Sequence, residues 1–304
     1  MTPDQTAELI CSELREKGYR GAVVPIEHVA QLKHEIEENV SRGKIDAELY
    51  ERYLAGFEFD VTTRLPKARS VIITAAPQPQ RKVTFHLSGQ TYPVIIPPTY
   101  YSDTDAEIRN ILQNTLSSKD YQLHLAALPS KLLAVCSGMA KYGKNNIAYV
   151  EDLGSFVRLR AFLSDMPTGR SDGFKPHVMK ECDKCKACLN ECPTKAIVPD
   201  RFLIHAERCI TFLNEGKEEF PAWVDPAWHN SLVGCMRCQL VCPVNKPFIK
   251  WVEEGEDFDE AETQLILNGV PLDHLPTETV GKLNRCYMME YLDLLPRNLR
   301  VFLK

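Results

Sequence analysis

Residues 182–193 read CDKCKACLNECP and residues 235–243 read CMRCQLVCP, with Cys209 between the two runs. Together these segments hold eight of the chain's eleven cysteines. In the first run, C-x2-C-x2-C-x3-C-P, three close thiolates can hold one iron–sulfur cube while the cysteine before the proline binds a second cube. The spacing therefore predicts two [4Fe–4S] clusters.

The pattern assigns every cysteine of this stretch to one of two four-thiolate sites. The first site, called cluster one, is predicted to use Cys182, Cys185, Cys188 and Cys242. The second site, called cluster two, is predicted to use Cys192, Cys209, Cys235 and Cys238. The three cysteines outside the stretch, Cys11, Cys136 and Cys286, are expected to be small buried side chains.

Two other uses of so many cysteines are open. Paired C-x2-C units also build tetrahedral zinc sites, although such a site does not call for a third cysteine two residues on or a fourth before proline. A disulfide framework is disfavoured, because the first residues, MTPDQTAELICSELREKG, have neither the basic start nor the apolar run of a signal peptide. Without export the thiols stay reduced, so dense cysteine indicates metal.

The composition is that of an ordinary globular protein. The 304 residues are 44% apolar and 25% charged, and the chain is long enough for two domains. No apolar run approaches the ~20 residues that a membrane helix needs, so we expect a cytoplasmic protein without a membrane partner. The formal net charge of -5 argues against a surface built mainly to neutralise phosphates.

The periodicity of apolar residues predicts an α+β fold. Helices are expected at residues 2–17, 27–39, 46–54, 103–118 and 131–142, strands at 22–26, 70–75, 147–150 and 155–163, and a hairpin at 82–96. This mixture predicts an α/β domain over residues 1–170. Pro, Gly, Ser and Asp cluster from Met166 to Pro176 and mark its boundary.

Two further segments are predicted after this boundary. Residues 171–250 are expected to form a bacterial ferredoxin-like double [4Fe–4S] domain, with a short hairpin at 196–205 and a helix that begins near Cys209. Residues 251–304 are expected to form a short helical C-terminal cap, with helices near 260–267 and 277–295.

The strongest local signal before the cysteines is GMAKYGKNN at residues 138–146. The simplest interpretation is a helix that ends at a C-cap glycine, Gly143. A glycine turn also lets the backbone approach a ligand closely, and Lys144, Asn145 and Asn146 offer donors to amides or a phosphate. Both interpretations stay open at the level of the residues.

This segment, together with GSF at residues 154–156, DMP at 165–167 and GCMRCQLVCPVN at 234–245, resembles the epoxyqueuosine reductases, which are related to the reductive dehalogenases. The resemblance implies a nitroreductase-like α/β domain that binds a base-off cobalamin beside the first of two [4Fe–4S] clusters. It also implies that Lys144, Asn145, Gly154 and Ser155 lie near the corrin. The reaction of that family reduces the epoxide of a modified tRNA base.

The aspartate that serves the family as proton donor, in a D-x-x-P element, has no counterpart here. Matching the proline to Pro129 places Ala126 at that position, whereas counting back from Lys144 places His124 there. His124 is therefore the candidate catalytic residue, because a histidine can donate a proton at neutral pH. The alternative is a partly buried histidine bonded to a backbone carbonyl.

We therefore expect a cobalamin-dependent reductase. Electrons from a low-potential donor of ferredoxin or flavodoxin type would pass through cluster two and cluster one to the cobalamin, which reduces a small-molecule or nucleoside-like substrate. A tRNA partner is weakly supported, because the chain is acidic and stops without the helical-repeat region that many members use against tRNA. The alternative function is an electron-transfer or corrinoid-reducing iron–sulfur protein without a substrate of its own.

Overall fold

The computed structural model describes residues 2–169 and 173–303. These residues form two compact units, each assembled from separate stretches of the chain. Unit 1 comprises Met1–Pro77, Ser102–Lys186 and Arg201–Ile204, and unit 2 comprises Gln78–Tyr101, Ala187–Asp200 and His205–Lys304. The expected ranges 1–170, 171–250 and 251–304 follow chain order and stay a prediction, and residues 170–172 of the expected boundary lie outside the described residues.

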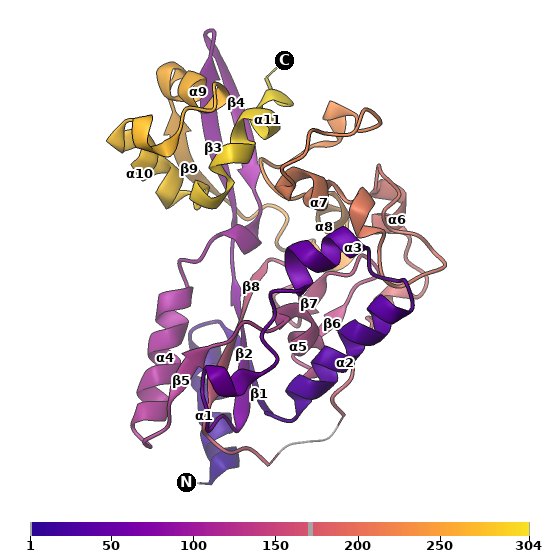
Figure 1. Ribbon diagram of the computed structural model, residues 1–304, viewed down its shortest axis with the longest axis vertical. Helices are drawn as coiled ribbons and strands as arrows, with labels where there is room; N and C mark the ends of the chain where they lie inside the picture. The colour runs from indigo at the N-terminus through magenta and orange to yellow at the C-terminus, as the bar shows by residue number, and fades with distance from the viewer. Residues whose placement is uncertain (1, 170–172, 304) are drawn as a thin grey trace. The chain divides into compact units, whose positions relative to one another are not determined.

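A four-stranded antiparallel sheet forms the middle of unit 1 (Figure 1). Its strands lie in the order β1 (Arg20–Pro25), β2 (Ser70–Pro77), β8 (Val157–Ser164) and β5 (Leu123–Leu125). Because β2 has a neighbour on both sides and layers above and below, residues 70–76 are all buried. This confirms the strand that the apolar run SVIITA predicts.

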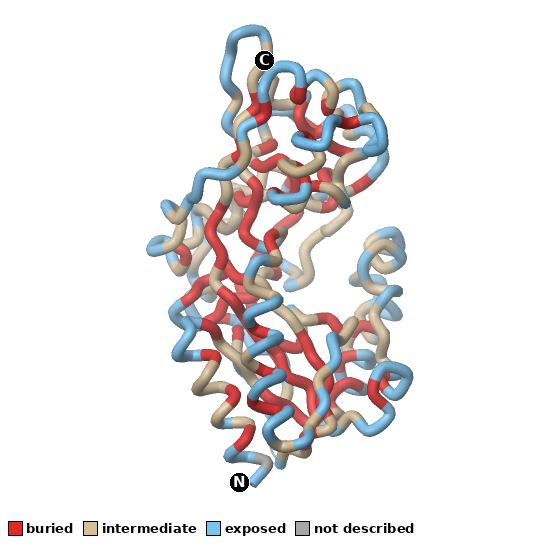
Figure 2. Tube along the Cα trace, turned by 90° about the vertical axis from the view of Figure 1, so that its left-hand side faces the viewer, coloured by how far each residue is buried: buried red, intermediate tan, exposed pale blue. Residues whose placement is uncertain are grey.

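Helices cover both faces of this sheet. Side chains alternate along a strand, so Val71 and Ile73 of β2 join one apolar core and Ile72 joins another. The first core is shared with α2 (His28–Ser41) and α5 (Ser130–Cys136), and the second with α1 (Pro3–Glu16) and α4 (Asp105–Ser117). Figure 2 shows the buried residues running along the strands, while the outer faces of the helices are exposed.

The helix expected at residues 131–142 was wrong in its second half. α5 ends at Cys136, and Gly138 follows with φ 81°, a left-handed conformation that terminates helices. The chain then forms a hairpin of β6 (Ala140–Tyr142) and β7 (Ala148–Val150). Ala140 and Tyr142 are buried while Lys141 between them is exposed, the alternation of a strand.

Unit 2 is built on a three-stranded sheet in the order β4 (Gln90–Ile96), β3 (Gln80–Leu87) and β9 (Val252–Phe258). The expected hairpin is confirmed: β3 and β4 are antiparallel, and Ser88 and Gly89 turn between them with positive φ. β9 adds in parallel to β3 and was not expected, because its sequence VEEGEDF is acidic rather than apolar. Lys82 of β3 pairs with Glu254 of β9 and offsets part of this charge.

Helices at the end of the chain pack on this sheet. α9 (Glu260–Leu267) matches its expected bounds. The single helix expected at 277–295 was wrong: α10 (Thr277–Arg285) ends before Tyr287, which has φ 57°, and a 3-10 segment, η9 (Met289–Leu294), leads into α11 (Leu295–Arg300). A bulky residue at positive φ interrupts helical geometry, which the apolar pattern alone does not reveal.

Short helices carry the cysteine stretch. They are α6 (Ala187–Glu191), α7 (Ile210–Glu215) and α8 (Arg237–Leu240). Cys209 is the N-cap residue of α7, so the helix expected there is confirmed. The hairpin expected at 196–205 was wrong: in the described chain these residues form no strand, since Pro199 cannot donate to a ladder, although His205 N donates to Ala196 O at 2.8 Å.

The other helical segments are short. α3 (Ala47–Leu49) continues into a π-helical turn, η1 (Tyr50–Leu54). Single 3-10 turns occupy η2 (Val61–Thr63), η3 (Pro98–Tyr100), η4 (Lys180–Cys182), η5 (Ala206–Arg208), η6 (Pro226–Trp228), η7 (Pro243–Asn245) and η8 (Leu272–His274). Within residues 2–169 and 173–303, no helix is both long and apolar enough to span a membrane.

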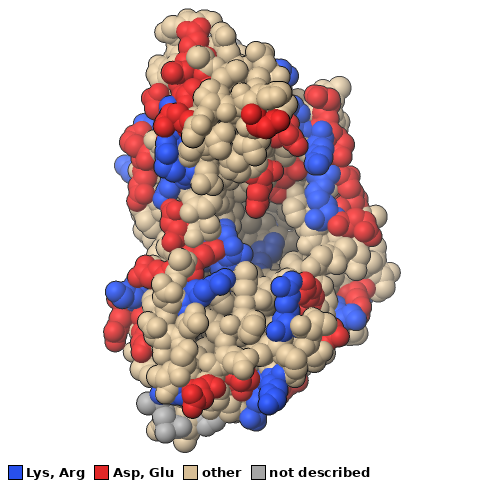
Figure 3. Space-filling model, turned by 60° about the vertical axis from the view of Figure 1, so that its left-hand side comes forward, with Lys and Arg blue, Asp and Glu red and all other residues tan. Residues whose placement is uncertain are grey.

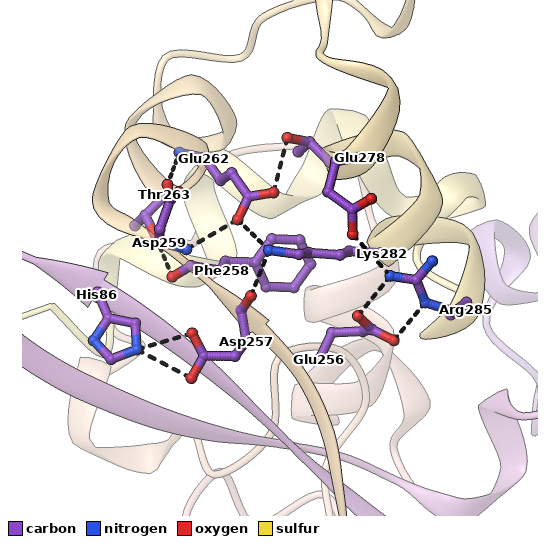
Figure 4. A network of polar contacts seen from close by, with 11 residues as sticks. His86, Glu256, Asp257, Phe258, Asp259, Glu262, Thr263, Glu278, Lys282 and Arg285 are labelled. Atoms are coloured by element: carbon purple, nitrogen blue, oxygen red, sulfur yellow. Dashed lines mark hydrogen bonds and ion pairs between the residues drawn. The ribbon is translucent and has the colours of Figure 1, made fainter.

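A buried ion pair ties the helices of unit 2 to β9 (Figure 4). Glu262 of α9 is 6% exposed and accepts hydrogen bonds from Asp259 N at 3.0 Å and Thr279 Oγ1 at 3.0 Å. Lys282 of α10 donates to Glu262 Oε2 at 2.5 Å and to Asp257 O at 2.8 Å. One carboxylate thus links α9 to α10, and one ammonium links α10 to β9.

We predict that Lys282→Met lowers the stability of unit 2 by about 2–3 kcal/mol, because it leaves the Glu262 carboxylate buried without its cation. Denaturant unfolding followed by circular dichroism measures the change. Lys82→Met is the matched control: its partner Glu254 is largely exposed, so the loss should stay below about 1 kcal/mol. Adding Glu262→Gln to Lys282→Met should recover part of the loss, and no recovery would contradict the interpretation.

Candidate functional site

All four predicted ligands of cluster two lie in unit 2. Cys192 follows α6, Cys209 caps α7, and Cys235 and Cys238 lie before and within α8. α6 packs against α8, and Cys192 and Cys209 lie near enough to Cys235 that a negative charge on either would raise its pKa. The fold therefore brings together thiols that are far apart in the sequence. The largest separation, from Cys192 to Cys238, is 238 − 192 = 46 positions.

The chemistry of these thiols suits a bound cation. All eight cysteines of the stretch are free thiols. Burial raises the pKa of the Cys235 thiol to about 12, and burial likewise raises the pKa of Cys209 above its usual value. A thiolate at such a position needs positive charge beside it, and iron supplies that charge.

The predicted thiolate ligands are arranged for a cluster rather than for a single metal ion. In the described residues, no three metal-binding side chains converge on a single point as they would around one ion. Each thiolate of a cube binds a different iron, so cube ligands do not have to converge in this way. Of the predicted ligands of cluster one, Cys182 and Cys185 belong to unit 1, whereas Cys188 and Cys242 belong to unit 2, and this set stays a prediction.

Arg237 fixes the loops that carry the ligands of cluster two. Its Nη1 donates to Glu191 Oε1 at 2.8 Å, next to Cys192, and its Nε donates to Trp228 O at 2.9 Å. A second support is Gly234, with φ 66°: a Cβ there would lie 2.5 Å from the hydroxyl of Tyr100. Only glycine therefore fits immediately before Cys235.

The glycine turn at residues 143–147 joins β6 to β7 in unit 1. Gly143 N donates to Ile147 O at 2.8 Å, and Asn146 N donates to Gly143 O at 3.0 Å. A Cβ on Gly143 would lie 2.5 Å from Asn145 Oδ1 and 2.6 Å from Tyr149 Cε2. Gly143 is thus required by close packing in a hairpin turn, and the interpretation as a helix C-cap was wrong.

The side chain of Asn145 is buried and its hydrogen bonds stay within this turn. Asn145 Nδ2 donates to Tyr149 Oη at 3.0 Å, and Asn145 Oδ1 accepts from Ile147 N at 3.3 Å. Lys144 is partly exposed beside it. Asn145 therefore shapes the turn, while Lys144 keeps an ammonium within reach of solvent.

Asn146 is the third residue of this turn that the sequence offers as a hydrogen-bond donor. Its side chain is 9% exposed, and Asn146 Oδ1 accepts from Ile204 N at 3.4 Å. Asn146 Nδ2 is buried and has no hydrogen-bond partner among the described residues. A buried donor without a partner costs free energy, so the Nδ2 group of Asn146 is a candidate hydrogen-bond donor to a ligand.

Asn146 lines a cavity of about 320 Å³ inside unit 1. Its walls are mainly apolar side chains from α2, η1 and the start of α5, together with Tyr142 and Phe202, whose rings meet edge to face at 5.3 Å. The lining residues are Glu35, Ile36, Asn39, Ile45, Leu49, Leu54, Phe57, Pro129, Ser130, Lys131, Leu132, Tyr142, Asn146, Pro176, Phe202 and Leu203. An apolar cavity with a few polar groups is typical of a small-molecule site.

The other expected site residues lie outside this lining, among the residues described. Gly154 has φ 60° and exchanges backbone hydrogen bonds of 2.9 Å with Val150, so it is tied to the end of β7, and Ser155 next to it is buried. His124 lies on the edge strand β5 and is exposed, which does not fit the alternative of a partly buried histidine. Ala126, the other match to the missing aspartate, packs against the core.

Comparison with known families identifies the cysteine stretch. Residues 181–245 match the family described as "4Fe-4S double cluster binding domain". The fold of unit 2 and its gathered thiols thus define a double-cluster iron–sulfur protein, as the spacing predicts. The match favours iron over the zinc alternative.

About two thirds of the chain is similar in sequence to epoxyqueuosine reductases. It is 31% identical over 226 residues to the epoxyqueuosine reductase of Bacillus subtilis, covering 68% of this chain and 55% of that protein. It is 34% identical over 122 residues to the Escherichia coli enzyme, covering 40% of this chain and 31% of that protein. The chain thus spans about half the length of the first relative and about a third of the second.

Solved structures agree on the fold. The epoxyqueuosine reductase from Bacillus subtilis superposes with a TM-score of 0.70 at 21% identity, covering 99% of this chain and 82% of that chain. An epoxyqueuosine reductase crystallised with an epoxyqueuosine-modified tRNA stem loop gives a TM-score of 0.68 at 22% identity over the same shares. This mixed α/β architecture with a double-cluster domain and a helical C-terminal segment confirms the expected fold class.

We predict that Cys192→Ala and Cys238→Ala each remove cluster two, about four irons, and keep most of cluster one, because each deletes a thiolate from only one cube. Iron and acid-labile sulfide analysis of anaerobically reconstituted protein, with electron paramagnetic resonance, measures the outcome. Cys286→Ala is the control, since this buried thiol lies outside the array and should leave both clusters in place. Loss of a single zinc ion instead of iron would contradict the assignment.

Proposed function

We propose that this protein is a cobalamin-dependent oxidoreductase in which two [4Fe–4S] clusters deliver electrons for the reduction of an epoxide on a modified nucleoside. The observation that carries the proposal is the double-cluster cysteine array in a chain that is similar to epoxyqueuosine reductases over 226 residues. Reduction of an epoxide consumes two electrons and two protons. The protein must therefore conduct electrons, hold a reductant beside the substrate, and supply protons.

The residues around cluster two suit electron transfer at low potential. Cys209 and Cys235 are partly buried, and the lowered dielectric around them disfavours the added negative charge of a reduced cluster. Arg237, between Cys235 and Cys238, places a positive charge in the same loop, which favours the reduced cluster and so offsets part of this effect. Its hydrogen bonds to Glu191 and to the carbonyl of Trp228 hold the loops in place, so little reorganisation accompanies a change of charge.

The turn of unit 1 offers groups that fit a corrinoid. Corrin rings carry amide arms, and the unpartnered Asn146 Nδ2 can donate to an amide oxygen. The cavity of about 320 Å³ would take one such arm rather than a whole macrocycle. Lys144, Asn145, Gly154 and Ser155 stay candidates for contacts with the remainder. A cobalamin bound there would supply a strongly reducing cobalt centre.

We infer that the substrate is epoxyqueuosine in a tRNA stem loop. The support is the solved relative that was crystallised with such a stem loop, which outweighs the weak support for tRNA in the composition. On the face shown in Figure 3, basic and acidic side chains are interspersed, and the net charge is -5. Affinity should therefore rest more on the nucleoside than on phosphates, with a shallow dependence on salt.

The second candidate function is electron transfer to a separate corrinoid protein, without a substrate of its own. The observation that favours it is the lack of an aspartate at either of the positions aligned with the family's proton donor, which hold His124 and Ala126. The two functions differ in whether this chain binds cobalamin and turns over substrate. The electron donor, of ferredoxin or flavodoxin type, is part of both proposals.

We predict that protein reconstituted anaerobically with iron and sulfide retains one equivalent of added cobalamin through a desalting column and shows the base-off Co(II) signal in electron paramagnetic resonance. With a chemical low-potential reductant it should then reduce an epoxyqueuosine-containing stem loop, detected by mass spectrometry of the nucleosides, and leave an unmodified stem loop unchanged. Full iron content with cobalamin in the flow-through would contradict the proposal and favour electron transfer.

We further propose His124 as the proton donor, because it is exposed on β5 at a position aligned with the expected acid. His124→Gln should lower kcat about 100-fold while cobalamin retention and both clusters are kept, since general acids contribute about 10²–10⁴. His34→Gln, which changes a histidine on α2, is the control and should leave kcat unchanged. Equal activity of the His124 variant and the native protein would exclude the role.

A further inference from the structure

His229, in the loop after η6 of unit 2, is a buried histidine with no hydrogen bond. Its side chain is 7% exposed, and neither Nδ1 nor Nε2 has a partner among the described residues. Its ring packs against Phe220, with centroids 4.6 Å apart and planes tilted by 57°. Buried polar atoms are nearly always paired, so an unpaired imidazole points to a partner that is not a protein group.

The charge state of this ring limits what the partner can be. Burial lowers the pKa of His229 to about 4, and Arg297 and Arg237 lower it further by repulsion. At neutral pH the imidazole is therefore uncharged and carries one N–H donor and one lone pair. An N–H held in a low-dielectric site requires an acceptor, and a negatively charged acceptor makes the strongest bond.

The loop of His229 is tied to the ligands of cluster two on both sides. Just before it, Arg237 donates to Ala227 O and Trp228 O, each at 2.9 Å. Just after it, Asn230 Oδ1 accepts from Met236 N at 3.2 Å. Arg237 and Met236 are the two residues between Cys235 and Cys238, so the same loop that presents two thiolates also fixes the backbone around His229.

We propose that the His229 N–H donates a hydrogen bond to a sulfur of cluster two and thereby sets the potential of that cluster. The sulfurs of a cube are electron-rich acceptors, and hydrogen bonds to them are one of the main determinants of its potential. The bond is stronger to the reduced, more negative cluster, so it raises the potential. His229 is thus a positioning residue for electron entry, and the proposal rests on the assignment of cluster two made above.

The effect is opposite in sign to that of burial. The protein around Cys209 and Cys235 disfavours the reduced cluster, while the His229 N–H favours it. Removing the N–H should therefore make cluster two harder to reduce without changing its iron content. Cluster one, whose predicted ligands include only Cys242 from this part of the chain, should be unaffected.

The test is a redox titration of anaerobically reconstituted full-length protein, followed by electron paramagnetic resonance. His229→Leu and His229→Phe should shift the reduced-to-oxidised ratio of one cluster about tenfold toward oxidised at a fixed potential, equal to about 59 mV for one electron. His229→Gln, which restores an N–H donor, should recover most of the shift. Phe220→Leu removes the neighbouring ring but no donor and should leave both potentials in place.

A second measurement does not depend on how well a variant folds. In native protein labelled with 15N-histidine, pulsed paramagnetic resonance of the reduced protein should detect a weak nitrogen coupling that His229→Gln removes. The same two potentials in the native, Leu, Phe and Gln proteins, or no nitrogen coupling in the native protein, would overturn the proposal. Native protein that holds only four irons would overturn the proposal for another reason, because cluster two would then not exist.

Discussion

The ligation of iron by partly buried cysteine thiolates is the interaction on which this structure depends. Burial raises the pKa of thiols such as Cys235 and Cys209, which favours the neutral thiol until a cation is bound beside it. Cluster assembly therefore releases protons and contributes folding free energy to the loops that hold the ligands. Those loops contain short helices and turns with little apolar core of their own, which makes them dependent on Arg237, Gly234 and the metal.

The rest of the chain gives these loops a rigid frame. In unit 2 the hairpin β3–β4 lies far from the cysteines in sequence, yet its partner strand β9 comes directly after them, and α9 and α10 are locked to β9 by Lys282 and Glu262. Unit 1 contains a sheet with an apolar core on each face and a tight turn at Gly143. Asn146, three residues after Gly143, lines an apolar cavity. In the proposed function, the ligands of cluster two and the cavity beside Asn146 thus belong to separately packed elements.

The sequence predicted the features whose chemistry is local. Cysteine spacing was enough for the double-cluster domain, a continuous apolar run located β2, and helical patterns located α1 and α9, each within a residue or two. Sequence-based prediction failed for elements that depend on residues far away in the chain. The acidic sequence of β9 predicts a solvent-exposed segment, and only the fold shows that Lys82 and Arg285 pair with its carboxylates. The sequence offered Asn146 only as one of three donors and did not point to His229, because an unpaired polar atom is visible only when the surrounding packing is known.

The central claim is that eight thiolates of this chain hold two [4Fe–4S] cubes. Mössbauer spectroscopy of 57Fe-enriched protein, purified without oxygen and without reconstitution, tests it most directly, alongside quantification of zinc and sulfide. The account predicts the spectrum of two [4Fe–4S] clusters, with about eight irons and eight sulfides per chain. Stoichiometric zinc without acid-labile sulfide would contradict it.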